Sequence, residues 1–490
     1  MKPFSGILML FIALFLVLQQ TTCYSNSLHH QKLHEFQRHI REKTSLDSPV
    51  DPNPRKRSGR IFYPMGYGAD PRGERDSSEA IMSALGDAIK LAETGAESFL
   101  TSGIRDLGGV VINLQGGSYK ISNPIRFPSR LGNVLVEGGS LRASNTFPGD
   151  RHLIELWAPN SQPLDKKTTD LHHDSKSSFY DKKDQNSEIY YEGITFRDVL
   201  FDSGYRGGGI KVIDSLRVQI NNCFFIHFST QGILVERGHE TFISSCFLGQ
   251  HSTAGGDRGE RGFSGTAIDL ASNDNAVTDV AIFSAATGII LRGQANIITG
   301  VHCYNKATYF GGVGILVQAA KTRIDNCYLD FNGIVIEDPH QVHVSNGFFL
   351  GDGNIVLKSI KGEISGLNIV NNMFSGDPGK MVPIIRLHGP FMNVDQVVID
   401  HNNVDGMRLK STVGKSSVRG NGTKWVVDFS SGLVFPNRIN HVYYSFFAQG
   451  GPGFPTHALR SVSSNVVVVE SDRAVDAIVS VAVDQNNFFM

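Results

Sequence analysis

The chain has 490 residues, a formal net charge of −1 at pH 7, 19% charged residues and 52 glycines. A charge this close to zero provides no whole-protein field for nucleic acid, so we expect no nucleic-acid partner and expect local cations to hold any anionic ligand. The length does not require several domains, because a repeat fold lengthens by adding turns to one continuous core.

The first 23 residues have the features of a secretory signal peptide. Lys2 precedes an apolar run from Ile7 to Leu18, which is too short to span a membrane, and Cys23 ends the segment. We therefore expect a secreted, extracellular protein that has no membrane contact in its mature form. Residues 24–60 are polar and basic, which is typical of a tail or linker.

One short phrase recurs from Tyr190 to about Ile369: an apolar residue, any residue, a small polar residue, then an apolar residue or Cys. Its successive starts are 20 to 34 residues apart, which is a solenoid period with loops inserted in some turns. Runs this short cannot bury an apolar face alone, so neighbouring copies must stack. The sequence therefore predicts an all-β fold, a right-handed single-stranded parallel β-helix. The copies start at Phe196, Ile220, Ile243, Val277, Ile298, Ile324, Val344 and Ile364.

A second phrase, glycine-apolar-any-apolar, follows most copies and predicts which side chains face solvent. Its two apolar residues point inward, so the residue between them and the residue after the phrase point outward. Successive coils lie about 4.8 Å apart, so outward residues form rows along the surface. The phrase starts at Gly232, Gly288, Gly314 and Gly333.

Both ends of a solenoid need a cover. Asp76-Ser-Ser-Glu79 is a capping box before an amphipathic helix with Ile81 and Leu85 on one face. After Met407 the repeat fades, and short alternating runs predict a different, antiparallel sheet. We expect a β-helix over residues 61–415, with a mobile polar loop at 161–188, and a C-terminal β cap over 416–490. The predicted cap strands are Val426–Val434, Val442–Phe447 and Val466–Glu470.

Several motifs resemble those of pectin-degrading enzymes of the pectate-lyase-like superfamily. Gly66-Tyr-Gly-Ala-Asp-Pro-x-Gly resembles the start of their β-helix, and three long motifs that begin at Thr146, Gly255 and Val466 resemble plant polygalacturonase-like proteins of the Quartet type. The resemblance implies a secreted glycoside hydrolase that cleaves α-1,4-galacturonosyl bonds of cell-wall pectin by acid/base hydrolysis. It implies a monomer that needs no cofactor and no metal.

The usual catalytic pattern of polygalacturonases is incomplete in this chain. Asp352 lies where the motif Gly-Asp-Asp is expected, and Gly353 replaces the second aspartate. Asp330 lies on the preceding coil, so Asp330 and Asp352 are candidates for the acid and the base, about 6.5 to 9.5 Å apart if the enzyme inverts. Cations on the later coils are candidates for binding the sugar carboxylates. These cations are Lys358, Arg386, His388, Arg408 and Lys410.

A rival centre lies earlier in the chain. The insertion from Gln250 to Ser264 contains Asp257 and Glu260 and leads into a strand with Asp269 facing outward, one coil after Glu236. A long charged loop of this kind is often functional, so Asp257, Glu260 and Asp269 are also candidate catalytic residues.

Two other functions remain open from the sequence. A calcium-dependent pectate lyase would use carboxylates to bind Ca²⁺ and Arg408 or Lys410 as the base. A non-catalytic pectin-binding β-helix is compatible with the replaced aspartate at Gly353.

Two features concern covalent modification. Cys223 and Cys246 occupy the same repeat position in adjacent coils, and both a disulfide and two free thiols are compatible with that spacing. Asn421-Gly-Thr is a sequon for N-glycosylation at Asn421.

Overall fold

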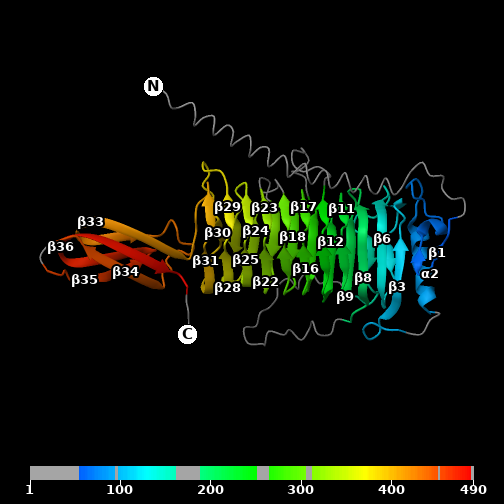
Figure 1. The fold of residues 1–490 in the computed structure, drawn as a ribbon, viewed down its shortest axis with the longest axis horizontal. Coiled ribbons are helices and arrows are strands. Elements are labelled where there is room, and N and C mark those ends of the chain that lie inside the picture. The colour runs from blue at the N-terminus through cyan, green and yellow to red at the C-terminus, as the bar shows by residue number, and fades with distance from the viewer. Residues whose placement is uncertain are drawn as a thin grey trace, which may run out of the picture.

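The computed structural model describes residues 54–93, 98–161, 188–250, 264–304, 312–450 and 453–486. The predicted signal peptide and nearly all of the predicted polar loop lie outside these residues. The 32 strands β1 to β32 form one sheet wound into a helix, and β33 to β36 form a separate four-stranded antiparallel sheet. Figure 1 shows the coils stacked along the long axis, with helix α2 at one end and the antiparallel sheet at the other.

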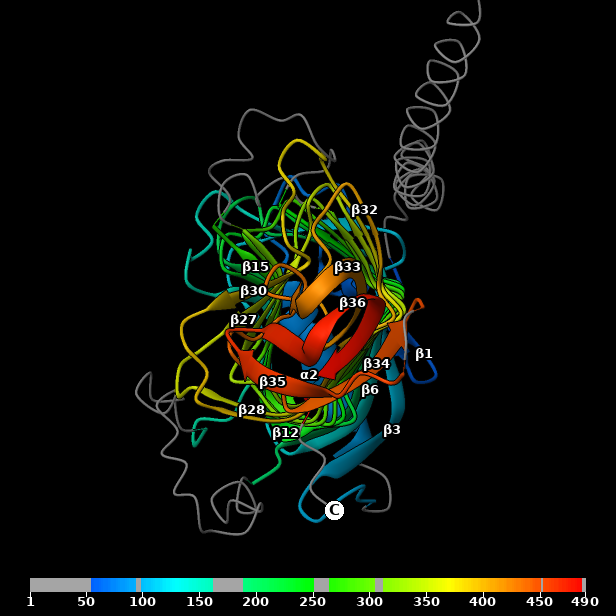
Figure 2. The ribbon, with the colours of Figure 1, turned by 90° about the vertical axis from the view of Figure 1, so that its left-hand side faces the viewer.

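Each full coil contributes three short parallel strands, one to each face of the β-helix. Strands β10 (Gln219–Asn221), β11 (Phe224–Ile226) and β12 (Gln231–His239) pair in parallel with β13 (Phe242–Ser244), β14 (Phe247–Gly249) and β15 (Thr266–Asn273) of the next coil. Figure 2, seen along the long axis, shows the coils superimposed around one core. The predicted right-handed parallel β-helix is confirmed.

The glycine phrase builds one face, which we call the glycine-phrase face. The glycines let neighbouring coils approach closely: a Cβ on Gly288 would lie 2.4 Å from the Gly314 carbonyl oxygen. Besides β12 and β15, its strands are β5 (Ile125–Phe127), β7 (His152–Leu156), β9 (Gly208–Leu216), β18 (Thr287–Leu291), β21 (Val313–Val317), β24 (Ile334–Glu337), β27 (Ile355–Lys358) and β30 (Ile385–His388).

The other two faces are formed by the remaining strands. The second face has β3 (Arg105–Asn113), β10, β13, β16 (Ala276–Thr278), β19 (Ile297–Thr299), β22 (Thr322–Asp325), β25 (His340–Ser345), β28 (Glu363–Val370) and β31 (Asn393–Asp400). The third has β4 (Ser118–Ile121), β11, β14, β17 (Ala281–Phe283), β20 (His302–Tyr304), β23 (Tyr328–Asp330), β26 (Phe348–Leu350), β29 (Met373–Ser375) and β32 (Asn403–Asp405). The long strands β6 (Leu131–Ala143) and β8 (Tyr191–Asp202) serve both faces.

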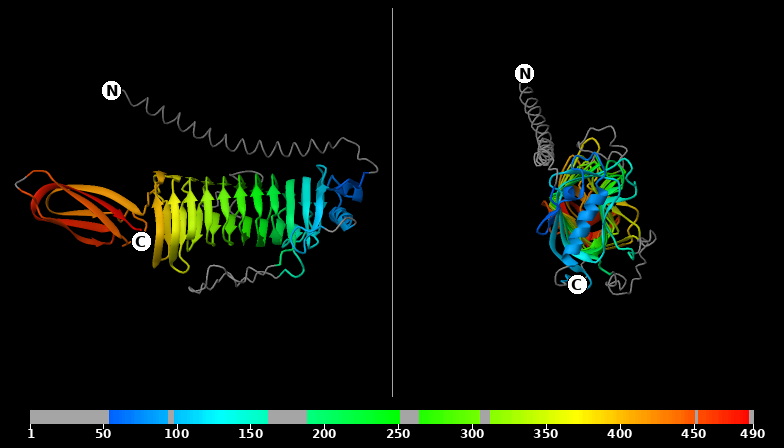
Figure 3. Two further views of the ribbon diagram at one scale, coloured as in Figure 1. Left: turned by 60° about the horizontal axis from the view of Figure 1, so that its bottom comes forward. Right: turned by 90° about the vertical axis from the view of Figure 1, so that its right-hand side faces the viewer.

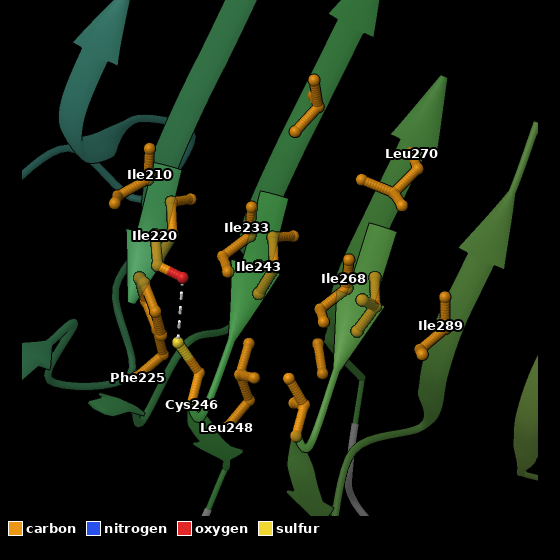
Figure 4. Packing of buried hydrophobic residues seen from close by; sticks show 14 of the residues in the cluster. Ile210, Ile220, Phe225, Ile233, Ile243, Cys246, Leu248, Ile268, Leu270 and Ile289 are labelled. Atoms are coloured by element: carbon orange, nitrogen blue, oxygen red, sulfur yellow. Dashed lines mark hydrogen bonds between the residues drawn. The ribbon is translucent and has the colours of Figure 1, made fainter. Parts of the chain in front are cut away.

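The core consists of inward rows of like residues. Ile210, Ile233, Ile268 and Ile289 occupy one position on four successive strands and are fully buried (Figure 4). Further along the chain, Ile334 is buried and Val335 is partly exposed, as the alternation predicts. The register of the glycine phrase is therefore confirmed.

The four described cysteines are all free and buried. Cys223 and Cys246 do lie on adjacent coils, and the Cys223 amide donates to Cys246 Sγ at 3.4 Å. Burial raises the pKa of Cys223 well above its usual value, and it also raises the pKa of Cys303 and Cys327. Of the two options that the sequence left open, the structure has the free thiols.

The first coil is covered by α2 (Ser78–Glu93), which follows β1 (Arg57–Ser58), β2 (Ile61–Phe62) and the short 3-10 helix η1 (Pro64–Tyr67). Ile81 and Leu85 are buried, as expected. The predicted capping box differs in detail, because Asp76 Oδ1 accepts the Ser78 hydroxyl at 2.8 Å and the Ser122 amide at 2.7 Å. Asp76 thus ties the helix to the coil beneath it.

The C-terminal sheet has its own apolar core around Trp425 and Val479. The prediction that residues 426–434 form a strand was wrong at its end, because β33 stops at Asp428, whose Oδ1 accepts the Ser430 amide at 2.8 Å and starts a turn. Figure 3 shows this sheet beyond the last coil. Its strands are β33 (Val413–Asp428), β34 (His441–Ala448), β35 (His457–Ser463) and β36 (Val466–Asp484).

In the described part of the chain, no helix combines the length and apolar character that a membrane span requires.

Candidate active site

Two outward rows of side chains run along the glycine-phrase face. The register of paired strands places each side chain directly beside its counterpart in the next coil, about 4.8 Å away. The first row is Lys211, Leu234, Asp269, Ile290, Leu316, Val335, Val356 and Arg386. In the second row Glu236 pairs with Ala271, and Glu337 pairs with Lys358 and Lys358 with His388; Arg292 and Gln318 directly follow the paired residues Leu291 and Val317 of the strands between them.

Asp269 is the most buried carboxylate among these row residues, at 5% exposure. Arg292, on the next coil, binds it through two contacts, Nε to Oδ1 at 2.9 Å and Nη2 to Oδ2 at 2.7 Å. Glu236 lies on the preceding coil, so Asp269 sits diagonally between a carboxylate and a guanidinium. Ala271 lies opposite Glu236, two residues after Asp269 on the same strand.

The surroundings of Asp269 raise the pKa of its carboxyl. Burial raises the pKa of its carboxyl most, the Arg292 guanidinium lowers it, and the negative charge of Glu236 raises it again. The net result is a pKa above the ordinary value, because desolvation and a like charge together outweigh the ion pair. Buried carboxyls with a raised pKa occur at functional sites and in structural ion pairs alike.

Glu236 and Asp269 have a spacing suited to a pair of catalytic carboxylates. Glu236 is opposite Ala271, two residues after Asp269 on the adjacent strand. One strand spacing combined with two residues along the strand places the origins of the two side chains about 8 Å apart. Side chains with origins at this separation can direct their carboxyls to the distance of about 6.5 to 9.5 Å that inverting glycosidases use.

Asp352 lies in the turn after β26, where its backbone has a φ of 66°. Its Oδ1 accepts the Asp377 amide at 2.7 Å, and its Oδ2 pairs with Lys380 Nζ at 2.7 Å. Both carboxylate oxygens therefore bind the loop that follows β29.

Asp330 and Asp352 lie on adjacent coils but not opposite each other. Asp330 is opposite Leu350, so Asp352 is shifted by two residues. Gly351 lies between Leu350 and Asp352, and its φ of 60° is part of the turn. Asp330 itself is partly exposed on β23 of the third face, next to Tyr328.

The predicted cations occupy different environments. Lys358 Nζ pairs with Glu337 Oε1 at 2.8 Å, and His388 follows Lys358 in the second row. Arg386 is exposed at the end of the first row, and Arg408 is exposed on the next coil, where it pairs with Pro383.

Lys410 faces the C-terminal sheet rather than the outer rows. Its Nζ donates to the Leu433 carbonyl oxygen at 3.0 Å. Burial and the nearby Arg408 charge lower its pKa.

Sequence reasoning missed Arg292 and Lys211 in the outward rows. The signal was present: Arg292 directly follows the phrase Gly288-Ile-Ile-Leu, and Lys211 is the middle residue of Gly209-Ile-Lys-Val. Lys211 makes no ion pair within the described residues. Its neighbour Glu155 is held by Arg151 and by Trp157 Nε1 at 2.8 Å.

The predicted catalytic residues Asp257 and Glu260 lie outside the described residues, and Asn421 is exposed on β33.

Across the ranges that the structure describes, no three His, Cys, Asp or Glu side chains are grouped so that they could hold a metal ion.

The chain is 51% identical over 456 residues to a protein named polygalacturonase QRT3 from Arabidopsis thaliana. The alignment covers 91% of this chain and 89% of that relative. The chain belongs to the plant Quartet-type polygalacturonase-like family. The family resemblance that the motifs at Thr146, Gly255 and Val466 indicate is therefore confirmed.

Other comparisons with this Quartet-type chain are more distant. No protein-family model matches it. Among solved structures, ORF18 of Geobacillus virus E2 has 12% identity and a TM-score of 0.47, over 84% of this chain and 76% of that chain. The A-module of mannuronan C-5 epimerase AlgE4 from Azotobacter vinelandii has 10% identity and a TM-score of 0.44, over 70% of this chain and 96% of that chain.

Proposed function

We propose that this Quartet-type protein is a secreted, cell-wall glycoside hydrolase that cleaves α-1,4-galacturonosyl bonds of pectin, with its catalytic centre at Asp269 and Glu236. The observation that carries the proposal is the buried Asp269 carboxyl, which lies at an outward position of a parallel strand beside Arg292 and has a pKa above its usual value. The family of its Arabidopsis relative supplies the substrate class.

In the proposed mechanism, protonated Asp269 donates its proton to the glycosidic oxygen as the bond from that oxygen to the anomeric carbon breaks. Glu236 takes a proton from a water, and the water oxygen forms the new bond to the anomeric carbon from the opposite side. Arg292 positions Asp269 through its two contacts. With the carboxyls this far apart, the expected outcome is inversion at the anomeric carbon.

The outward rows would hold the polysaccharide along the helix axis. Cations flank the proposed centre on both sides, with Lys211 two coils before Asp269 and Arg386 five coils after it. Between Asp269 and Arg386 the first row is apolar, at Ile290, Leu316, Val335 and Val356. Guanidinium and ammonium groups bind sugar carboxylates, while the apolar row can lie against sugar rings.

A second candidate function is favoured by one observation. The two short contacts from Arg292 to Asp269 would also suit a carboxylate that only stabilises the fold. In that case the protein binds pectin without cleaving it.

A reducing-end assay on purified protein with polygalacturonate separates these functions. The proposal predicts new reducing ends and no ultraviolet absorbance from unsaturated sugars. Reducing ends together with that absorbance would identify a lyase, and binding without new reducing ends would identify the non-catalytic protein.

A further inference from the structure

We infer that the outer surface of the C-terminal sheet is a second polysaccharide-binding site, distinct from the Asp269 centre, and that it takes an acidic polysaccharide. The choice of an acidic polymer rests on the proposed function, whereas the site itself rests on the side chains of β33, β34 and β36.

Strand β34 divides its aromatic residues between two sides. Tyr444 and Phe446 pack against the core of the C-terminal sheet, where the Phe446 ring is 5.0 Å from Trp425 between centroids. Tyr443 and Phe447 point to the opposite side and are 72% and 62% exposed. The inward aromatics account for folding, so the two outward rings need another explanation.

Each outward ring belongs to a row of three side chains that runs across β34, β36 and β33, and we call such a row a rung. Tyr443 is opposite Ala482 of β36, and Ala482 is opposite Lys415 of β33. Phe447 is opposite Ile478, and Ile478 is opposite Arg419. Each rung therefore has an aromatic ring, an apolar residue and a cation in the same order.

The rung between them consists of hydroxyl groups. Ser445, Ser480 and Ser417 lie side by side, and the Ser417 and Ser480 hydroxyl oxygens are 2.8 Å apart. Phe447 is four positions after Tyr443 on one strand, which places the two residues about 14 Å apart. Rings at both ends and hydroxyls between them suit a linear polymer that has apolar ring faces and polar edges.

Around the rungs, the described outer side carries two cations and two carboxylates, and one of the cations, Lys415, is unpaired. Arg419 lies 3.7 Å from Asp476, and Asp484 Oδ1 accepts the Asn486 amide at 2.8 Å. Lys415 makes no ion pair within the described residues, so it can bind a sugar carboxylate beside the Tyr443 ring. His441 is the remaining titratable side chain on the outer side of β34.

The two exposed rings alone offer less area than a stable interface with a second copy of the chain needs. Two aromatic side chains with these exposures offer about 300 Å², whereas a standard protein interface buries about 800 Å² on each partner. A polysaccharide chain needs only the few sugars that span the two rungs.

The test is affinity electrophoresis in gels that contain polygalacturonate, with all variants built in an Asp269→Asn background. This background keeps the polymer intact and makes the result independent of whether the protein is a hydrolase. Tyr443→Ala/Phe447→Ala and Lys415→Ala should each weaken binding, the double variant by about tenfold or more, equivalent to ~1.4 kcal/mol. Phe454→Ala is the matched control, because Phe454 is 99% exposed and lies on neither rung.

Three results would overturn the inference. One is that polygalacturonate slows the double variant and the Phe454→Ala control equally in the gel while their thermal unfolding midpoints are also equal. Another is equal retardation by a neutral polysaccharide. The third is concentration-dependent dimerisation in light scattering that disappears in the double variant while polymer binding stays unchanged. Failure of the proposed hydrolase activity would appear separately, as absent reducing ends in the wild-type protein.

Discussion

Asp269, on the glycine-phrase face, and Asp352, in the turn after β26, hold their carboxylates in different environments. Both oxygens are paired in each case, Asp269 with Arg292 and Asp352 with Lys380 and a backbone amide. Asp269 differs in that burial and the neighbouring Glu236 charge together raise its pKa. The comparison shows that burial and a neighbouring charge, rather than free oxygens or a recognisable motif, set the Asp269 carboxyl apart.

The largest effect is expected from Glu236→Gln. The variant lacks the proposed base, so turnover should fall by a factor of about 10² to 10⁴. It should also shift the alkaline limb of the pH–rate profile to lower pH. Glu236 raises the pKa of Asp269, and the active, protonated acid is lost as pH rises through that value. If the variant keeps its turnover and the alkaline limb of its pH–rate profile does not shift, Glu236 does not act together with Asp269.

The amino-terminal coils hold a second buried titratable group, His152, at 3% exposure. Burial lowers the pKa of His152 to about 4. The unfolded chain takes up this proton near pH 6.5 and the folded chain does not, so stability present above pH 6.5 is lost as pH falls towards 4. This shift in pKa corresponds to a loss of about 3 kcal/mol in the free energy of unfolding.

Urea unfolding at pH 7 and pH 4 measures this loss. His152→Leu should lose less stability between the two pH values than the wild type. His401→Gln, whose ring is exposed, is the control and should follow the wild type. Identical losses in wild type and His152→Leu would show that His152 protonates equally well in the fold.

Asp352 should affect stability rather than catalysis. Asp352→Ala removes the acceptor of the Asp377 amide and the Lys380 pair at a position with positive φ, and should cost about 1 to 3 kcal/mol of unfolding free energy. Asp352→Asn keeps an acceptor and tolerates this φ, so it should cost about 0 to 1 kcal/mol. Thermal unfolding of both variants checks the order, and equal losses would contradict the proposed role of the amide contact.

The smallest effect is expected from Arg386→Ala. Arg386 is an exposed cation at the far end of the first row, so its loss should raise KM on polygalacturonate about two- to fivefold with kcat unchanged. Arg323→Ala, on the second face, is a matched exposed control and should leave KM unaltered. A rise in KM for both variants would indicate a general charge effect rather than binding along the row.

The sequence was sufficient to predict the β-helix, because a period of two within each phrase and a longer period between phrases leave few other folds. The same rule places Arg292 on the outside, directly after its phrase, so the partner of Asp269 could have been found. The pairing of Asp352 with Lys380 could not, because Lys380 comes from a loop outside the repeat. The raised pKa of Asp269 depends on burial by several coils, which no single phrase encodes.

The sequence predicted that the C-terminal sheet is antiparallel, but it did not predict how long the strands are. Strand β36 runs from Val466 to Asp484, through the polar residues 470–474 that suggest an end after Glu470. It continues because β36 bulges at residues 471–474, between its pairings with Lys424 and Gly422, and keeps pairing with β33 on both sides of the bulge. A local pattern cannot show this, since the pairing partner lies more than forty residues earlier.

The most direct test of the central claim is turnover on polygalacturonate by Asp269→Asn and Asp352→Asn, measured side by side on folded protein. The account predicts that Asp269→Asn loses a factor of about 10² to 10⁴ in kcat while Asp352→Asn stays near the wild-type value. Wild-type turnover in Asp269→Asn together with an inactive Asp352→Asn would contradict it and move the catalytic centre to the later coils.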